Sequence, residues 1–214
     1  MIRGPRLFAL IALAGLALAS LLLTFRSQSV GTAEQARLST DYFFRNAEIS
    51  LIGTDGSTAI LVNTGKAARA VDNETLVLET VHVRRVGPQP WSLTADTAKL
   101  PHESGDLTAE DNVRLTFGPS GQWVADAREA RIITDGPSLT LTREFRIHRP
   151  DGGAGGSEIS GEHIVLEPES MKAETDQRVR LKVGGIEFEA NGLIAHIGEQ
   201  LITLDRDVRL VRDE

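Results

Sequence analysis

Apolar and polar residues alternate in short runs along most of this chain. In the runs 107–117, 139–148 and 173–183, the odd positions are mostly apolar and the even positions are polar or charged. A strict period of two is typical of a β-strand with one buried and one solvent-exposed face. The chain after its N-terminal segment shows no convincing amphipathic helix pattern. The alternation therefore predicts an all-β domain of antiparallel strands.

The alternating runs recur at a nearly constant interval. Each contains two apolar residues two positions apart, and the first members of these pairs are 32, 32, 34 and 29 residues apart: Val81, Val113, Phe145, Val179 and Val208. A repeat of this length indicates one supersecondary unit stacked on copies of itself. We therefore expect about five hairpin-like units between Ala59 and Val211. They form two facing sheets in an elongated, open stack.

One polar position interrupts the apolar parity of each copy. It lies two residues before the first apolar anchor, at Glu79, Asp111, Arg143, Gln177 and Arg206. Because a charge in a dry core is costly without a partner, this position predicts a corner where the strand bends from one sheet to another and the side chain reaches water. Small residues spaced three apart, such as Ala95 and Ala98, predict a β-bulge at the same corner.

Both ends of such a stack leave a strand edge without a neighbour. The strand near Asn46–Ile52 and the last strand, Leu201–Val211, are therefore candidate docking edges for a partner that adds a β-strand. The residues that we assign to these interfaces are Tyr42, Phe44, Ala47, Ile49, Leu204, Val208 and Leu210.

The N-terminal segment is apolar. Residues 7–25 carry no charge, Arg3 and Arg6 precede them, and Arg26 follows. At about 1.5 Å per residue, a helix of this length spans roughly 28 Å, close to the ~30 Å hydrocarbon core of a bilayer. We expect one transmembrane α-helix with a cytoplasmic N-terminus. The alternative is a signal peptide cleaved after Ala19, which is disfavoured because the apolar run continues through that site.

The remaining charge and the cysteine count restrict the partners. Without the three N-terminal arginines, 20 basic and 30 acidic residues remain, which argues against a nucleic-acid partner because that requires a basic surface. The chain has no Cys, so it forms no disulfide and carries no lipoprotein anchor.

The sequence carries no recognisable catalytic constellation. Its five His residues lack the spacing of metal ligands, and its acidic clusters lie in turns or on the solvent-facing parity. There is no G-x-S-x-G elbow, and no helix follows the Gly-rich loop 152–156 to bind a phosphate. We therefore predict no enzyme activity, no metal and no cofactor.

The inward parity supplies a continuous set of apolar residues between the two sheets. If the sheets are splayed, this set forms a trough that suits acyl chains. Burying one 14-carbon chain is worth about 10 kcal/mol, close to the cost of leaving a membrane, so net movement requires a powered partner. The candidate groove residues are Leu93, Leu100, Leu115, Phe117, Ile132, Phe145, Ile147, Leu166, Leu181 and Phe188. Ile197 belongs to the same inward set.

Three segments, together with the single N-terminal span, resemble the LptC family. They are the aromatic segment Asp41–Ala47, the strand Trp91–Asp96, and the Asn112–Leu115 type of strand that recurs through the domain. The resemblance implies a twisted, open β-jellyroll that carries lipid A acyl chains during lipopolysaccharide transport. It implies a cytoplasmic N-terminus at 1–6, a transmembrane helix at 7–25, a periplasmic linker at 26–40 and a periplasmic LptC/OstA-like domain at 41–214.

The resemblance also implies partners and a location. Lipopolysaccharide arrives from an inner-membrane ABC transporter, LptF/LptG with the LptB ATPase, and leaves to an LptA-like periplasmic bridge protein. By analogy, the N-terminal edge joins the transporter and the C-terminal edge joins the bridge, and a homodimer belongs to the same set of partners. The protein is then a single-pass protein of the inner membrane with most of its chain in the periplasm.

Two other interpretations stay open. In the first, the chain is a membrane-anchored scaffold with a dry core that binds partners but no lipid. In the second, it is a polysaccharide enzyme on a β-solenoid, which requires carboxylates projecting from successive repeats. The mainly basic outward row disfavours that enzyme: His82, Arg114, Arg146, Arg180 and Arg209.

Overall fold

The computed structural model describes residues 40–53, 58–70, 74–102, 105–134, 136–150 and 156–211. The chain divides into the units Met1–Ser39 and Thr40–Glu214, and the described residues all belong to the second. The predicted transmembrane helix at 7–25 and the predicted linker up to residue 39 lie outside the described residues. Within the described part, no helix is long and apolar enough to cross a membrane.

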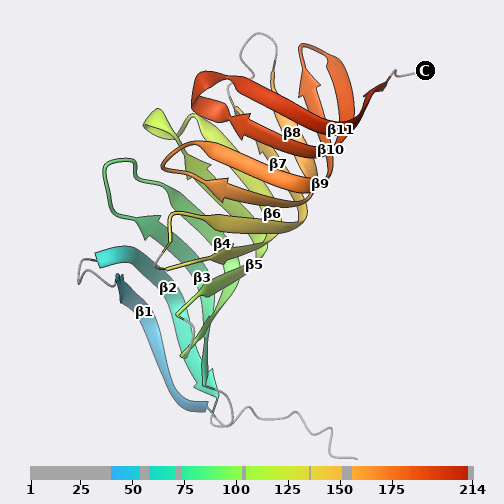
Figure 1. Ribbon diagram of the computed structural model, residues 1–214. Coiled ribbons are helices and arrows are strands. Elements are labelled where there is room, and N and C mark those ends of the chain that lie inside the picture. The colour runs from blue at the N-terminus through green and yellow to red at the C-terminus, as the bar shows by residue number, and fades with distance from the viewer. Residues whose placement is uncertain are drawn as a thin grey trace, which may run out of the picture. The chain divides into compact units, whose positions relative to one another are not determined.

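Eleven antiparallel strands form one sheet whose order follows the chain from β1 to β11 (Figure 1). Two short 3₁₀ turns, η1 (Pro119–Gly121) and η2 (Ile197–Glu199), complete the described secondary structure. The strands are β1 (Thr40–Ile52), β2 (Thr58–Ala70), β3 (Thr75–Arg85), β4 (Ser92–Pro101), β5 (Leu107–Phe117), β6 (Trp123–Ile132), β7 (Leu139–His148), β8 (Glu158–Glu167), β9 (Lys172–Val183), β10 (Ile186–His196) and β11 (Leu201–Val211).

The predicted repeat is confirmed as five hairpins. Its copies correspond to β2–β3, β4–β5, β6–β7, β8–β9 and β10–β11, and each apolar anchor pair lies in the second strand of its hairpin. β1 precedes the repeats and extends the sheet by one strand. Figure 1 shows the strands stacked in sequence with a progressive turn in strand direction, as the right-handed twist of β-strands requires.

The strands bend at the predicted polar corners. Asp111 and Arg143 adopt left-handed φ values of 61° and 58°, and their successors Asn112 and Glu144 do the same at 49° and 65°. The strand registers shift at these positions, between Glu110 and Val113 and between Thr142 and Phe145. The predicted corner residues are all exposed. The corner and the bulge are therefore confirmed.

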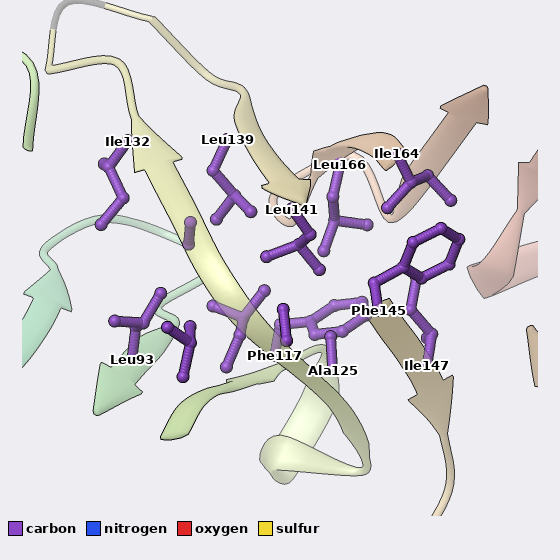
Figure 2. Close-up of a cluster of buried hydrophobic side chains, with 14 of the residues drawn as sticks. Leu93, Phe117, Ala125, Ile132, Leu139, Leu141, Phe145, Ile147, Ile164 and Leu166 are labelled. Atoms are coloured by element: carbon purple, nitrogen blue, oxygen red, sulfur yellow. The ribbon is translucent and has the colours of Figure 1, made fainter. Parts of the chain in front are cut away.

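The two facing sheets that the sequence predicts are the two layers of one hydrogen-bonded sheet. The bulges bend each strand without ending it. The halves of a strand before and after its bend therefore belong to two facing layers of a single hydrogen-bonded sheet. Figure 2 shows the consequence: Ile132, Leu139 and Leu141 form one row of side chains, and Leu93 and Phe117 lie in the row opposite. Both rows belong to one buried apolar cluster.

Gly161 in β8 provides a test of this bend. A Cβ atom at this position would lie 2.9 Å from the carbonyl oxygen of Arg178 and 3.0 Å from a ring carbon of Phe145. We expect Gly161→Ala to lower the free energy of unfolding by about 1–3 kcal/mol, because the crowded atoms include backbone. Gly87→Ala is the control, since a Cβ there meets no atom within 4 Å. Equal changes in urea unfolding of both variants would contradict this packing.

Candidate functional site

The interior between the two layers is the largest apolar feature of the described residues. Its buried cluster takes members from every strand between β2 and β10. Eight of the ten predicted groove residues are buried members of it: Leu93, Leu115, Phe117, Ile132, Phe145, Ile147, Leu166 and Leu181. The other two, Leu100 and Phe188, are partly buried and pack against the cluster. The structure thus brings the predicted set together, while its contact with lipid stays a prediction.

The interior holds no buried charged residue among those that the structure describes. Its buried polar residues are threonines, and each has a hydrogen-bond partner. The Thr64 hydroxyl donates to the carbonyls of Lys66 and Glu79, each at 2.8 Å. The Thr134 hydroxyl donates to the Gly105 carbonyl at 2.5 Å. Such an interior suits apolar contact rather than acid–base chemistry.

One long side of the interior is closed by contacts of strand ends and turns that are far apart in sequence. The Arg85 Nε lies 3.0 Å from a carboxylate oxygen of Glu169, and its Nη1 donates to the Thr134 carbonyl at 3.5 Å. Farther along, Met171 lies so close to Gly118 that a Cβ there would be 3.1 Å from the Met171 methyl carbon. These contacts hold the edges of the two layers together.

Beyond Met171 this side opens into a pocket of 540 Å³. The start of β6, the end of β9, the start of β11 and the described turn residues before β8 and β11 enclose it. Its lining residues are Trp123, Arg149, Gly156, Ser157, Ile159, Leu181, Val183, Ile197, Gln200, Leu201 and Ile202. Of these, the sequence identified the inward Leu181 and Ile197 and the edge residue Leu201. The others come together only through the fold.

The outward basic row is largely neutralised by acidic residues of neighbouring strands. Arg114 lies 3.4 Å from Asp126, and Arg146 lies 2.5 Å from Glu158. The hydrogen bond that Arg146 donates to Glu158 raises the pKa of Arg146. Hydrogen bonds from Arg178 and then Arg180 lower the pKa of Glu189 below its ordinary value. These pairs disfavour the row as a binding site for lipid phosphates.

The two ends of the sheet are strands β1 and β11, each hydrogen-bonded to one neighbour within the described part of the chain. Phe44, Val208 and Leu210 of the predicted interfaces are about half exposed, at 55%, 50% and 53%. Ala47, Ile49 and Leu204 are partly buried, and the backbone of Tyr42 pairs with Arg69. Phe43, which belongs to the aromatic segment Asp41–Ala47, is 59% exposed beside Phe44.

These features define a class: an open-ended β-jellyroll with an apolar interior and two terminal strand edges. Among the described residues, no cluster of three or more His, Asp or Glu is placed to hold a metal ion. A family model described as "Lipopolysaccharide-assembly, LptC-related" matches residues 9–121 and 114–213. The chain therefore belongs to the LptC-related family and takes part in lipopolysaccharide transport.

Nine solved chains match this one. LptH, the LptA-homologous periplasmic component of the lipopolysaccharide transport device from Pseudomonas aeruginosa, aligns with a TM-score of 0.49 at 15% sequence identity. The alignment covers 59% of this chain and 96% of LptH. No curated protein matches the sequence.

Proposed function

We propose that this protein receives lipopolysaccharide from an ATP-driven transporter of the inner membrane and passes it along its interior to a periplasmic bridge protein. The observation that carries the proposal is the apolar interior, which runs through successive hairpins and contains no buried charged residue within the described part. Membership of a lipopolysaccharide-assembly family supplies the cargo. The ten groove residues named above are the proposed contacts for its acyl chains.

The energetics favour a passive conduit. Transfer of a 14-carbon acyl chain from a bilayer into an apolar groove changes the free energy little. The chain loses about 10 kcal/mol of burial energy on leaving the bilayer and regains it in the groove. A passive groove therefore gives lipid a path but no direction. We assign the direction to ATP hydrolysis in an LptB ATPase bound to LptF/LptG in the inner membrane.

The two sheet ends provide the proposed docking edges. β1, through Tyr42, Phe44, Ala47 and Ile49, adds to a strand of the transporter's periplasmic part. β11, through Leu204, Val208 and Leu210, adds to a strand of an LptA-like bridge protein. A second copy of this chain competes for the same edges and gives a homodimer.

The proposed location follows from the N-terminal segment. Its 19 uncharged residues at 7–25 are long enough to anchor the chain once in the inner membrane. Residues 1–6 then lie in the cytoplasm, residues 26–40 form a periplasmic linker, and the domain 41–214 lies in the periplasm.

A membrane-anchored scaffold is the second candidate function. It is favoured by the complete burial of central side chains such as Leu93 and Ile147, which are 0% exposed. A scaffold needs the same edges but passes no lipid. Contact with lipid therefore distinguishes the conduit from the scaffold, whereas partner binding does not.

The C-terminal edge gives a direct test of the handover. We expect the double variant Val208→Lys/Leu210→Lys to weaken binding of the bridge protein by about tenfold or more, because Lys on an edge strand opposes strand addition. Val77→Lys is the control, since Val77 is 39% exposed but lies on the internal strand β3. Affinity is measured with the full chain in nanodiscs, and equal affinity of all three proteins would exclude β11 as the docking edge.

A further inference from the structure

One ion pair connects parts of the sheet that are not neighbours. The Arg85 Nε donates a hydrogen bond to the Glu169 carboxylate at 3.0 Å. Arg85 ends β3 and Glu169 lies in the turn between β8 and β9, so β4, β5, β6 and β7 lie between them along the sheet. A pair such as Lys99–Glu110, at 2.8 Å, instead joins hydrogen-bonded neighbours. The Arg85–Glu169 pair therefore closes the curled sheet into a ring around the interior.

The two partners of this pair come from opposite layers. The arginine lies two residues after Val83, which is paired in register with Leu93 of one layer. The glutamate lies three residues after Leu166, which is paired with Leu139 of the facing layer. The arginine also donates to the carbonyl of Thr134, which follows β6 in that facing layer. The contact thus crosses the seam where the two layers meet.

The pair is partly withdrawn from water. The side chains of Arg85 and Glu169 are 19% and 34% exposed. In such a pair, the cost of removing water from the two charges offsets much of their attraction. The pair therefore fixes a specific contact between the layers but adds little net stability, so it opens at low cost.

A lipid with a charged headgroup requires this side of the domain to open. The interior holds no buried charged residue among those that the structure describes, so the headgroup must stay in water while the lipid moves. The same side is open at the pocket beyond Met171 but closed at Arg85. A lipid that moves toward β11 therefore meets the closed part of the seam before the open part.

We propose that Arg85 and Glu169 form a latch that opens to let each lipid headgroup pass and then closes the seam behind it. The inference rests on the proposed function and adds a gate to it. The structure describes the closed state, and passage requires a second state in which the ion pair and the bond to Thr134 are broken. Arg85 and Glu169 are then positioning residues that act through the two layers.

The chain has no Cys, so a pair of Cys residues can be placed across the latch without background labelling. Val86 and Ser170 directly follow the two latch residues and are exposed, so Val86→Cys/Ser170→Cys leaves the ion pair in place. The full chain is assembled with the proposed transporter in proteoliposomes. Electron–electron double resonance between spin labels on the two Cys measures the distance across the seam. We expect this distance to lengthen while ATP drives lipopolysaccharide transfer and to stay short without lipid.

A short bismaleimide that links the same two Cys residues locks the seam. Locking is expected to slow transfer of lipopolysaccharide to the bridge protein by at least about tenfold, whereas N-ethylmaleimide, which caps each Cys separately, is expected to have no effect. Lys99→Cys/Glu110→Cys is the matched control, because its link joins neighbouring strands and leaves the seam free. If the first pair does not fold, Val86→Cys/Ile133→Cys replaces it, since Ile133 is 39% exposed and precedes Thr134.

Removal of one charge tests the ion pair itself. We expect Glu169→Gln to raise the share of the long distance in the lipid-free protein about fivefold, because Arg85 then keeps only its bond to the Thr134 carbonyl. Glu110→Gln, which breaks the control pair, is expected to leave the distance unchanged. An unchanged distance in both variants overturns the role of the ion pair.

The outcomes separate the latch from the broader function. A distance that lengthens during transfer, together with loss of transfer on locking, supports the latch. Normal transfer through the locked protein overturns the latch and leaves the proposed function intact. A distance that never lengthens also overturns the latch, even where locking slows transfer, because the linker itself then obstructs the path. Absence of transfer by the unlinked protein, with a transporter that hydrolyses ATP, overturns the proposed function and the latch together.

Discussion

Truncation of Phe145 to Ala is expected to lower the free energy of unfolding by about 3–5 kcal/mol. The Phe145 side chain is 2% exposed and follows the bend of β7, where its ring contacts the backbone position of Gly161 on β8. Figure 2 shows it at the edge of the central cluster, close to Ile147 and Ile164. Its removal leaves a cavity that the bent strands cannot close without breaking their register.

Phe43→Ala is the matched control for this prediction. Phe43 is the same residue type, but it is 59% exposed on the terminal strand β1. Its truncation is expected to change the free energy of unfolding by less than about 1 kcal/mol. Urea unfolding of the full chain, followed by circular dichroism, measures both. A loss for Phe145→Ala no larger than that for Phe43→Ala would show that the bend does not depend on this ring.

A charge at the C-terminal end of the interior is expected to stop lipid passage without unfolding the domain. Phe188 on β10 is only partly buried and packs against the core, so Phe188→Asp leaves its carboxylate near water in the empty protein. When acyl chains fill the interior, that carboxylate loses its water. The penalty is at least about 3 kcal/mol, or roughly a hundredfold in passage.

Ile194→Asp on the same strand is the control for Phe188→Asp. Ile194 is 40% exposed, so a carboxylate there keeps its water whether or not lipid fills the interior. Delivery of newly made lipopolysaccharide to the cell surface measures passage, and the melting temperature measures folding. If Phe188→Asp is folded and supports normal delivery, lipid does not pass this residue.

The strand pattern and the bends were predictable because both follow from residues close together in sequence. The alternation of apolar and polar residues showed which positions of a strand are buried. A charged residue at one of those positions, such as Asp111, indicated the bend of the strand. Asp111 and Asn112 are also residue types that tolerate left-handed φ values, whereas Arg143 and Glu144 are not, so their conformation is imposed by the sheet. The corner predicted that each strand continues from one layer into the other, but alternation does not show that the hydrogen bonds of all eleven strands join the two layers into a single sheet.

The interior residues were predictable for the same reason, and the pocket was not. The inward parity of the strands was enough to identify Leu93, Phe117 and Ile147 as interior residues. The pocket required Trp123 at the start of β6 to meet Ile197 and Ile202, which lie far away in sequence around the η2 turn. The pocket lies where the contacts of Arg85 and Met171 between the two layers end. Only the three-dimensional arrangement defines that point.

In-cell photocrosslinking tests the central claim most directly. A photoreactive side chain replaces Phe145, Ile147 or Leu166 in turn, and adducts are probed for lipopolysaccharide. The outward position Arg146, which is paired with Glu158, is the control. We predict adducts at the three inward positions, none at Arg146, and loss of all adducts when the cell's ATP supply is removed. Absence of adducts at every inward position, in a protein shown to be folded and membrane-anchored, would contradict the conduit and favour the dry scaffold.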